Sequence, residues 1–288
     1  MRIGMIGCGN MGGGMAAHLV DNGQEVHCFD PNPEVLKSLE ALGALKAASA
    51  SDLAARCDLI ILSLPNAAVV RGVMAEITPH LRDGSVVLDT STSEPETSKE
   101  MAALGTAKGF AFVDGPVSGG PSAARLGTMT MLLGGDRDVI KRLQPVTDLL
   151  TAMTVVVGGA GAGHAAKIVN NMLCAANLVL VAEAVRLGEA AGVEARDLLE
   201  GVNAGSGRSG VSEVNFPKWI LNGAFDSGFT MGLMRKDVSL AQKLAEESGV
   251  ALNGFEAIAH IWLEGSRAIP DTADFNEITK YGNGGKGE

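Results

Sequence analysis

Gly7-Cys8-Gly9-Asn10-Met11-Gly12 is the stretch that decides the fold of the first half of the chain. An apolar run, Arg2–Ile6, stands directly before it, and a helix-forming run, Met15–Val20, follows it. A second apolar run, Glu25–Phe29, then ends at Asp30, 23 residues after the first glycine. Strand, glycine turn, helix, strand and acid in this order indicate a βαβ unit that binds a dinucleotide.

Each glycine of this fingerprint has a physical task. Gly7 permits the tight turn, Gly9 lets the backbone approach a pyrophosphate, and Gly12 lets the helix pack closely on the strand. Asn10 and Met11 belong to the same turn, at the start of a helix whose free N–H groups and partial positive charge favour phosphate. We therefore predict that residues 7 and 9–12 bind a dinucleotide cofactor.

The acid at the end of the second strand indicates which dinucleotide is bound. Asp30 can accept hydrogen bonds from the ribose hydroxyls of the adenosine. The 2′-phosphate of NADP would lie against this carboxylate, and the next residues, Pro31, Asn32 and Pro33, offer no Arg to balance it. The sequence thus favours NAD over NADP.

Composition excludes several other classes of protein. The chain has 288 residues, of which 46% are hydrophobic, and a formal net charge of −10. This length predicts one or two domains, and the acidic balance argues against a nucleic-acid surface. No segment reaches roughly 18 uninterrupted apolar residues, and the N-terminus lacks a signal cleavage pattern. We expect a cytoplasmic protein that does not bind membranes.

The cysteines and histidines give no sign of a metal site or a disulfide framework. The four cysteines form no CxxC pair, and the five histidines form no HxxxH or HExxH pair. Buried free thiols and no metal are the expectation. The cysteines are Cys8, Cys28, Cys57 and Cys174.

The chain changes character near residue 160. Before that point short apolar runs alternate with helical patterns, as in parallel βα units, and several runs are continuous, as in strands buried on both faces. After the glycine-rich segment at 158–163, His164–Ala191 reads as one long, largely apolar and therefore buried helix. We predict a Rossmann-type doubly wound α/β domain over residues 1–160 and an all-α domain over residues 161–288. The strands predicted beyond the first two are Leu59–Leu64, Val86–Leu88, Phe110–Val113, Thr130–Leu133 and Thr154–Val157; the helices are Pro33–Leu42, Ser51–Ala55, Val69–His80 and Asp138–Leu150.

The second domain is predicted to consist of further helices with loops at 203–210 and 221–228. Residues after Tyr281 read GNGGKGE, a composition typical of a mobile tail.

Two further segments carry candidate chemistry. The loop Asp114-Gly115-Pro116-Val117-Ser118-Gly119-Gly120 supplies a hydroxyl and successive backbone N–H groups, which can hold a carboxylate or form a plain turn. Lys167 and Asn171 stand four residues apart on the long helix and hence on one face. The neighbours of Lys167 are apolar, although a solvated lysine would fit the same pattern.

Together these segments resemble the β-hydroxyacid dehydrogenase family, which includes 3-hydroxyisobutyrate dehydrogenases and tartronate semialdehyde reductases. The resemblance covers nearly the whole chain and rests on several motifs in the family's order. The family usually has Ala where Gly115 stands, a small departure. The motifs are the fingerprint, Leu64-Pro65-Asn66, Asp89-Thr90-Ser91-Thr92, the DGPVSGG loop at 114–120, GAGAGHAAKIVNN at 159–171, and LMRKDVSLA around Lys236.

The resemblance implies a role for each matching residue. The groove for NAD would be lined by Leu64, Pro65, Asn66 and Thr92, and Lys236 would reach the cofactor from the second domain. Ser118, Gly119 and Gly120 would hold the acid group of a small carboxylate substrate, Asn171 would orient that substrate, and Lys167 would be the catalytic acid and base.

The predicted reaction is hydride transfer between NAD and a small β-hydroxy acid, with Lys167 exchanging the proton. Such a lysine needs a lowered pKa, which apolar packing favours. Two alternatives stay open: reduction of another short semialdehyde, of tartronate, succinate or a sulfonate, and a catalytically silent NAD-binding module. Decarboxylating relatives carry Glu where Cys174 stands here, so we expect no decarboxylation. The long apolar helix suggests a homodimer or homotetramer.

Overall fold

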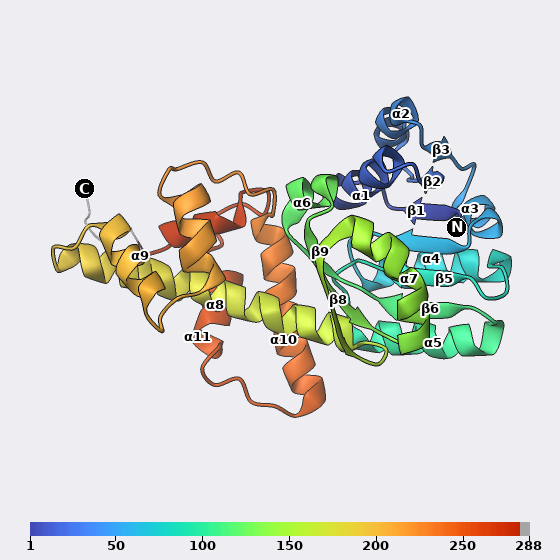
Figure 1. Cartoon of the computed structure of the whole chain (residues 1–288). Coiled ribbons are helices and arrows are strands. Elements are labelled where there is room, and N and C mark those ends of the chain that lie inside the picture. Colours follow the sequence, from blue (N-terminus) through green and yellow to red (C-terminus); the bar gives the residue numbers. More distant parts are fainter. Residues whose placement is uncertain (283–288) are drawn as a thin grey trace. The chain divides into compact units, whose positions relative to one another are not determined.

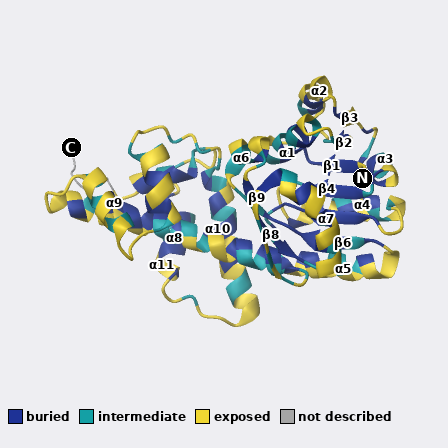
Figure 2. Cartoon of the chain, viewed as in Figure 1, coloured by how far each residue is buried: buried dark blue, intermediate teal, exposed yellow. Residues whose placement is uncertain are grey.

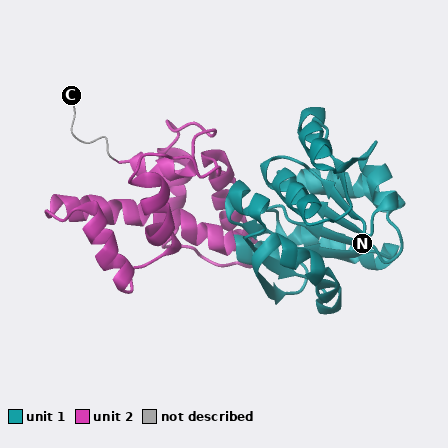
Figure 3. Ribbon diagram, turned by 45° about the horizontal axis from the view of Figure 1, so that its top comes forward, with its two compact units in different colours: residues 1–167 teal, residues 168–288 magenta. Residues whose placement is uncertain are grey.

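The computed structural model describes residues 1–282 and divides into two compact units, Met1–Lys167 and the residues from Ile168 onward (Figure 3). The division lies inside the long helix α8 (Ala162–Ala190), a little beyond the boundary predicted at residue 160. The predicted tail after Tyr281 falls almost entirely on residues 283–288, which lie outside the described part of the chain.

The first unit is built on a nine-stranded sheet in the order β3-β2-β1-β4-β5-β6-β8-β7, with β9 paired to β8 (Figure 1). The first six strands in this order, from β3 through β2, β1, β4 and β5 to β6, are parallel to one another. Strand β8 runs antiparallel to β6 and β7. Parallel pairing of β9 with β8 completes the sheet. The strands are β1 (Ile3–Ile6), β2 (Val26–Phe29), β3 (Leu45–Lys46), β4 (Leu59–Leu62), β5 (Val86–Asp89), β6 (Ala111–Asp114), β7 (Val117–Ser118), β8 (Met129–Gly134) and β9 (Thr151–Gly158).

Helices cover both faces of this sheet, because the side chains of each central strand alternate between two cores. Leu59 and Ile61 of β4 face the core formed with α1, α2 and α7, whereas Ile60 and Leu62 face the core formed with α3, α4 and α5. The doubly wound fold is therefore confirmed. The helices are α1 (Asn10–Asp21), α2 (Pro33–Leu42), α3 (Ala50–Arg56), α4 (Ala67–Ile77), η1 (Thr78–His80), α5 (Pro95–Lys108), α6 (Gly120–Leu126) and α7 (Arg137–Leu150).

The second unit is helical and has a core of its own. Trp262, fully buried, lies in this core and donates a hydrogen bond from Nε1 to the carbonyl oxygen of Ala175 at 3.1 Å. An isolated β-bridge joins Thr230 and Asp274. Besides α8 the elements are α9 (Ala195–Ala204), the π-helix η2 (Val211–Ile220), α10 (Met231–Ser248), α11 (Glu256–His260), the π-helix η3 (Ile261–Gly265) and the 3-10 helix η4 (Phe275–Lys280).

Helix α8 is buried on one side only, contrary to the expectation of a fully buried helix. Apolar side chains along its other side are exposed, and Figure 2 shows the exposed and buried residues alternating along it. Its mean hydropathy of 1.7 over 18 residues would permit a membrane span by length and composition, but the core helix of a soluble protein meets the same criterion. The exposed positions are Val169, Leu173, Leu180 and Leu187.

Candidate active site

The predicted cofactor residues of the first unit gather at one edge of the sheet, at the carboxyl ends of parallel strands. The fingerprint follows β1, Asp30 follows β2, residues 64–66 follow β4, and Thr92 follows β5. Ligands of open α/β sheets bind along this edge, where the strand order reverses; here that point lies between β1 and β4.

The glycines of the fingerprint fit a dinucleotide. Gly7 has φ +89°, which favours glycine. A Cβ on Gly12 would lie 1.9 Å from the carbonyl oxygen of Gly7, so α1 packs on the turn without room for a side chain. A Cβ on Gly9 would meet nothing within 4 Å, so the backbone there is open to a pyrophosphate. The residues present therefore fit NAD.

Asp30 is held in place by the backbone on both sides. Its Oδ2 accepts from the N–H of Cys8 at 2.7 Å, and its Oδ1 accepts from the N–H of Asn32 at 2.8 Å. Because each carboxylate oxygen has a second lone pair, hydrogen bonds to ribose hydroxyls can add to these. In the segment between β4 and α4, Asn66 caps α4 by accepting a hydrogen bond from Val69 N, and Leu64 N donates to Ser91 Oγ.

The structure brings Lys167 and the predicted acid-binding loop together. Lys167 is 7% exposed, and its Nζ donates to Ser118 Oγ at 2.7 Å. Ser118 ends the short strand β7, and Gly119 and Gly120 follow it with φ values of +127° and +72°. A Cβ on Gly119 would lie 2.6 Å from the Cβ of Ala123, so a side chain there cannot be accommodated without movement.

Asn171 and Lys236 belong to the second unit, where both side chains contact the carboxylate of Asp237. Asn171 is 5% exposed, and its Nδ2 donates to Asp237 Oδ2 at 2.5 Å. Lys236 Nζ lies 3.3 Å from the other oxygen of Asp237. We did not predict Asp237 as a site residue. A charge between the buried positions Met234 and Val238 of α10 is the signal that points to it.

Two of the free cysteines, Cys8 and Cys57, are not suited to nucleophilic chemistry. Burial raises the pKa of Cys57 to about 12, and the pKa of Cys8 is also raised, by its hydrogen bond with Cys28 and then by burial. Thiolates are therefore scarce at neutral pH. Cys8, Cys28 and Cys57 are buried as predicted, whereas Cys174 is half-buried. Within residues 1–282 no three His, Cys, Asp or Glu side chains are grouped to hold a metal ion.

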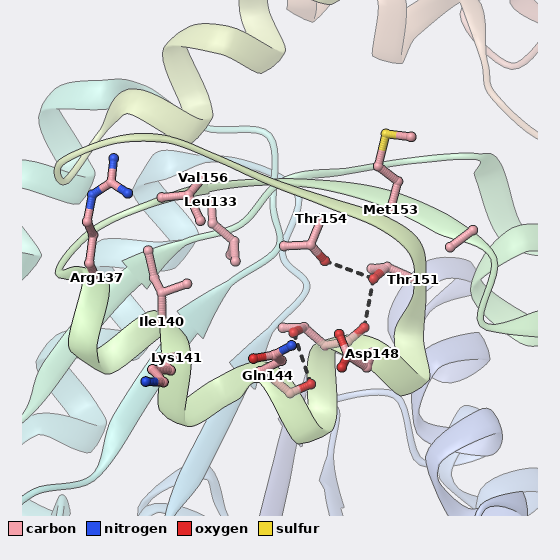
Figure 4. A pocket seen from close by; sticks show the side chains of 12 residues that line it. Leu133, Arg137, Ile140, Lys141, Gln144, Asp148, Thr151, Met153, Thr154 and Val156 are labelled. Atoms are coloured by element: carbon pink, nitrogen blue, oxygen red, sulfur yellow. Dashed lines mark hydrogen bonds between the residues drawn. The ribbon is translucent and has the colours of Figure 1, made fainter.

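A cavity of about 410 Å³ in the first unit lies elsewhere, between α7 and β9. Its lining includes the hydroxyls of Thr151 and Thr154, which are hydrogen-bonded to each other at 2.9 Å (Figure 4). Neither Ser118 nor Lys167 lines it. This cavity is therefore separate from the residues to which we assign chemistry.

Two family models together match nearly the whole chain. Residues 2–159 match the family described as the NAD-binding domain of 6-phosphogluconate dehydrogenase, and residues 161–281 match the NAD-binding family of NADP-dependent 3-hydroxyisobutyrate dehydrogenase. The 2-(hydroxymethyl)glutarate dehydrogenase of Eubacterium barkeri is 37% identical over 93% of this chain and 90% of its own.

Two further similar proteins are also dehydrogenases of small hydroxy acids. The NAD-dependent L-serine dehydrogenase of Pseudomonas aeruginosa is 35% identical over 86% of each chain. The structure of the Mycobacterium tuberculosis 3-hydroxyisobutyrate dehydrogenase with L-serine superposes with a TM-score of 0.91 and 31% identity, covering 97% of this chain and 99% of the other.

A Rossmann-type domain with an NAD fingerprint, followed by a helical domain, defines a nicotinamide-dependent oxidoreductase that acts on CH–OH groups. Within that class, the chain belongs to the β-hydroxyacid dehydrogenase family.

Asp30→Asn should relax the preference for NAD over NADP. The amide keeps the shape of the side chain but loses the charge that repels a 2′-phosphate, and its NH₂ group replaces one of the two oxygens that accept backbone N–H groups. A charged hydrogen bond is worth roughly 1.5–3 kcal/mol. We expect KM for NAD to rise about 10- to 100-fold with kcat nearly unchanged. Steady-state kinetics with both cofactors measures this. A wild-type enzyme with the higher kcat/KM for NADPH would show that Asp30 does not select the cofactor.

Proposed function

We propose that this chain interconverts a small β-hydroxy acid and its semialdehyde, with Lys167 as the residue that exchanges the proton. The observation that carries the proposal is the buried amine of Lys167, 2.7 Å from Ser118 Oγ in the loop predicted to hold the acid group. A positioned acid or base in a water-poor site is what carbonyl–alcohol interconversion requires.

The residues of the chain divide the reaction between them. Residues 7 and 9–12 together with Asp30 would hold NAD, which would supply the hydride acceptor in oxidation and the hydride donor in reduction. In oxidation, neutral Lys167 accepts the hydroxyl proton as the C–H bond breaks and the C=O bond forms. In reduction, the Lys167 ammonium donates that proton to the carbonyl oxygen. Ser118 accepts a hydrogen bond from Nζ and so fixes the direction of the amine.

The names of the similar proteins share one chemical unit, which defines the substrate class we propose. 3-Hydroxyisobutyrate, 2-(hydroxymethyl)glutarate and L-serine all contain a hydroxymethyl group on the carbon that bears a carboxylate. The reacting carbon is thus two bonds from the carboxyl carbon. The proposed substrate has the form HOCH₂–CH(R)–COO⁻. Reduction of tartronate semialdehyde yields glycerate, which has the same form.

We also propose that a second copy of this chain covers the exposed apolar side of α8, which contains Leu173, Leu180 and Leu187. Leu173, Leu180 and Leu187 repeat every seven residues, as in helices that pack on one another. Their exposed fractions of 53%, 52% and 74% leave an apolar stripe that monomers rarely retain.

Lys167→Met should lower kcat by about 10²–10⁴, the usual contribution of a placed acid–base group. Binding of NADH, followed by its fluorescence, should stay near the wild-type value. Lys141→Met, which changes an exposed lysine of α7, is the matched control and should leave both quantities unchanged. A parallel loss of NADH affinity in Lys167→Met would make Lys167 a cofactor or folding residue.

The carboxylate of the substrate should be essential. A panel of HOCH₂–CH(R)–COO⁻ acids, with their amides and methyl esters, should show turnover of at least one acid and a loss of several orders of magnitude in kcat/KM for its neutral derivatives. Two or three charged hydrogen bonds of roughly 1.5–3 kcal/mol each are lost together. Equal turnover of neutral alcohols would contradict the substrate class, and NADH binding without any turnover would indicate a silent module.

Leu180→Glu should dissociate the assembly. A charge in the centre of an apolar interface costs several kcal/mol unless it is paired. Sedimentation velocity should show a dimer or tetramer for the wild type and a monomer for the variant. Leu126→Glu, which changes an exposed leucine of the first unit, is the control. A monomeric wild type at micromolar concentration would contradict the proposal.

A further inference from the structure

A buried carboxylate fixes the start of the helix that carries Lys167. Asp114, fully buried at the end of β6, accepts hydrogen bonds from two backbone N–H groups at the beginning of α8. Gly161 N donates to its Oδ1 at 2.7 Å, and His164 N donates to its Oδ2 at 2.9 Å. Both carboxylate oxygens are therefore used to hold backbone groups that a helix start leaves without a partner inside the helix.

The side chain of His164 holds the same turn from another side. It is fully buried, with Nε2 2.9 Å from the carbonyl oxygen of Ser91 and Nδ1 2.8 Å from Ser98 Oγ. A carbonyl oxygen only accepts, so Nε2 carries a proton, and Nδ1 and the hydroxyl of Ser98 share the second hydrogen bond. The turn is thus connected to the segment after β5 and to α5, as well as to β6.

Glycines leave no space for this turn to slide along the sheet. A Cβ on Gly163 would lie 2.4 Å from the carbonyl oxygen of Leu132 and 2.8 Å from Asp114 Oδ2. A Cβ on Gly134 would lie 2.6 Å from Gly163 N and 2.7 Å from the same carboxylate oxygen. The helix start therefore packs directly against the backbone of β8.

We propose that Asp114 and His164 are positioning residues for Lys167, which fix the first turn of α8 so that Nζ stays directed at Ser118. Lys167 follows His164 by three residues, about one helical turn. Ser118 follows Asp114 by four residues in the same loop, so one loop holds both the helix start and the amine. The inference rests on the proposed role of Lys167 in proton transfer.

Asp114→Asn tests this directly. The amide can accept only through Oδ1, and its NH₂ group then faces a backbone N–H, so one of the two anchoring bonds is lost. A misplacement of about 1 Å can cost about 10²-fold in rate, and we expect kcat to fall 10- to 100-fold. NADH affinity and KM should change less than threefold. The substrate is 3-hydroxyisobutyrate, or the best acid of the panel described above.

Asp136→Ala is the matched control, because an Asn at this position would still accept both hydrogen bonds through its Oδ1. Asp136 Oδ1 accepts from the backbone N–H groups of Asp138 and Val139 at the start of α7, which carries no predicted site residue. Loss of this similar anchor should lower the melting temperature but leave kcat unchanged at 25 °C. An equal fall in kcat for both variants would indicate a general effect on stability and would overturn the proposal.

A second comparison separates positioning from any independent effect of Asp114. Lys167→Ala should be nearly inactive and should regain activity with added ethylamine, which supplies an untethered amine. In the Lys167→Ala background, Asp114→Asn should change the ethylamine-supported rate less than twofold, because there is no tethered amine left to position. A further 10-fold loss in the double variant would show that Asp114 acts in another way. An active Lys167→Ala enzyme would instead contradict the proposed function.

Ser98→Ala keeps the proposal testable if Asp114→Asn does not fold. It removes the hydroxyl that meets His164 Nδ1 and leaves the carboxylate in place. Loss of this hydrogen bond should lower kcat about 3- to 10-fold and should have no effect on ethylamine rescue in the Lys167→Ala background. An unchanged kcat in Ser98→Ala would remove His164 from the proposal, and an unchanged kcat in a folded Asp114→Asn would overturn it.

Discussion

The first unit depends on a close approach between backbone segments at the carboxyl edge of its sheet. Helix α1 begins so near the turn after β1 that a Cβ on Gly12 would lie 1.9 Å from the Gly7 carbonyl oxygen. Helix α8 begins under the same constraint, since a Cβ on Gly163 would lie 2.4 Å from the Leu132 carbonyl oxygen. Helix α1 is predicted to bind phosphate, and helix α8 carries Lys167. Both helices have in their first turn a glycine whose backbone packs directly on the backbone of another segment.

Buried charge is the second constraint, because an ionised group taken out of water costs several kcal/mol unless it is hydrogen-bonded. Burial raises the pKa of Asp114, and the N–H groups of Gly161 and His164 act in the opposite direction. Asp237 is matched by the Asn171 amide and the Lys236 ammonium. Lys167 Nζ donates a hydrogen bond to the hydroxyl of Ser118, and only 7% of this residue is exposed.

Local sequence was sufficient for the strands buried on both faces and for the fingerprint. Helix α5 was missed because it has no apolar stripe: its buried positions are Pro95, Thr97, Ser98 and Gly105, small or polar groups that pack closely. The two-residue strand β7 is too short for any periodicity. The sequence also located the DGPVSGG loop but not the task of Asp114, because its hydrogen-bond partners stand 47 and 50 residues further along the chain. Only the folded sheet shows such a pairing.

The backbone hydrogen bonds to Asp30 give a physical reason why this carboxylate can discriminate between NAD and NADP. Asp30 is fixed before any ligand arrives, because Cys8 N holds one oxygen and Asn32 N holds the other. A carboxylate free to rotate could turn away from a 2′-phosphate, whereas this one would have to give up hydrogen bonds that shape the fingerprint loop. Specificity of this kind comes from a repulsive element that the protein cannot easily relax. The residue predicted to discriminate against NADP is therefore also a structural part of the fingerprint loop.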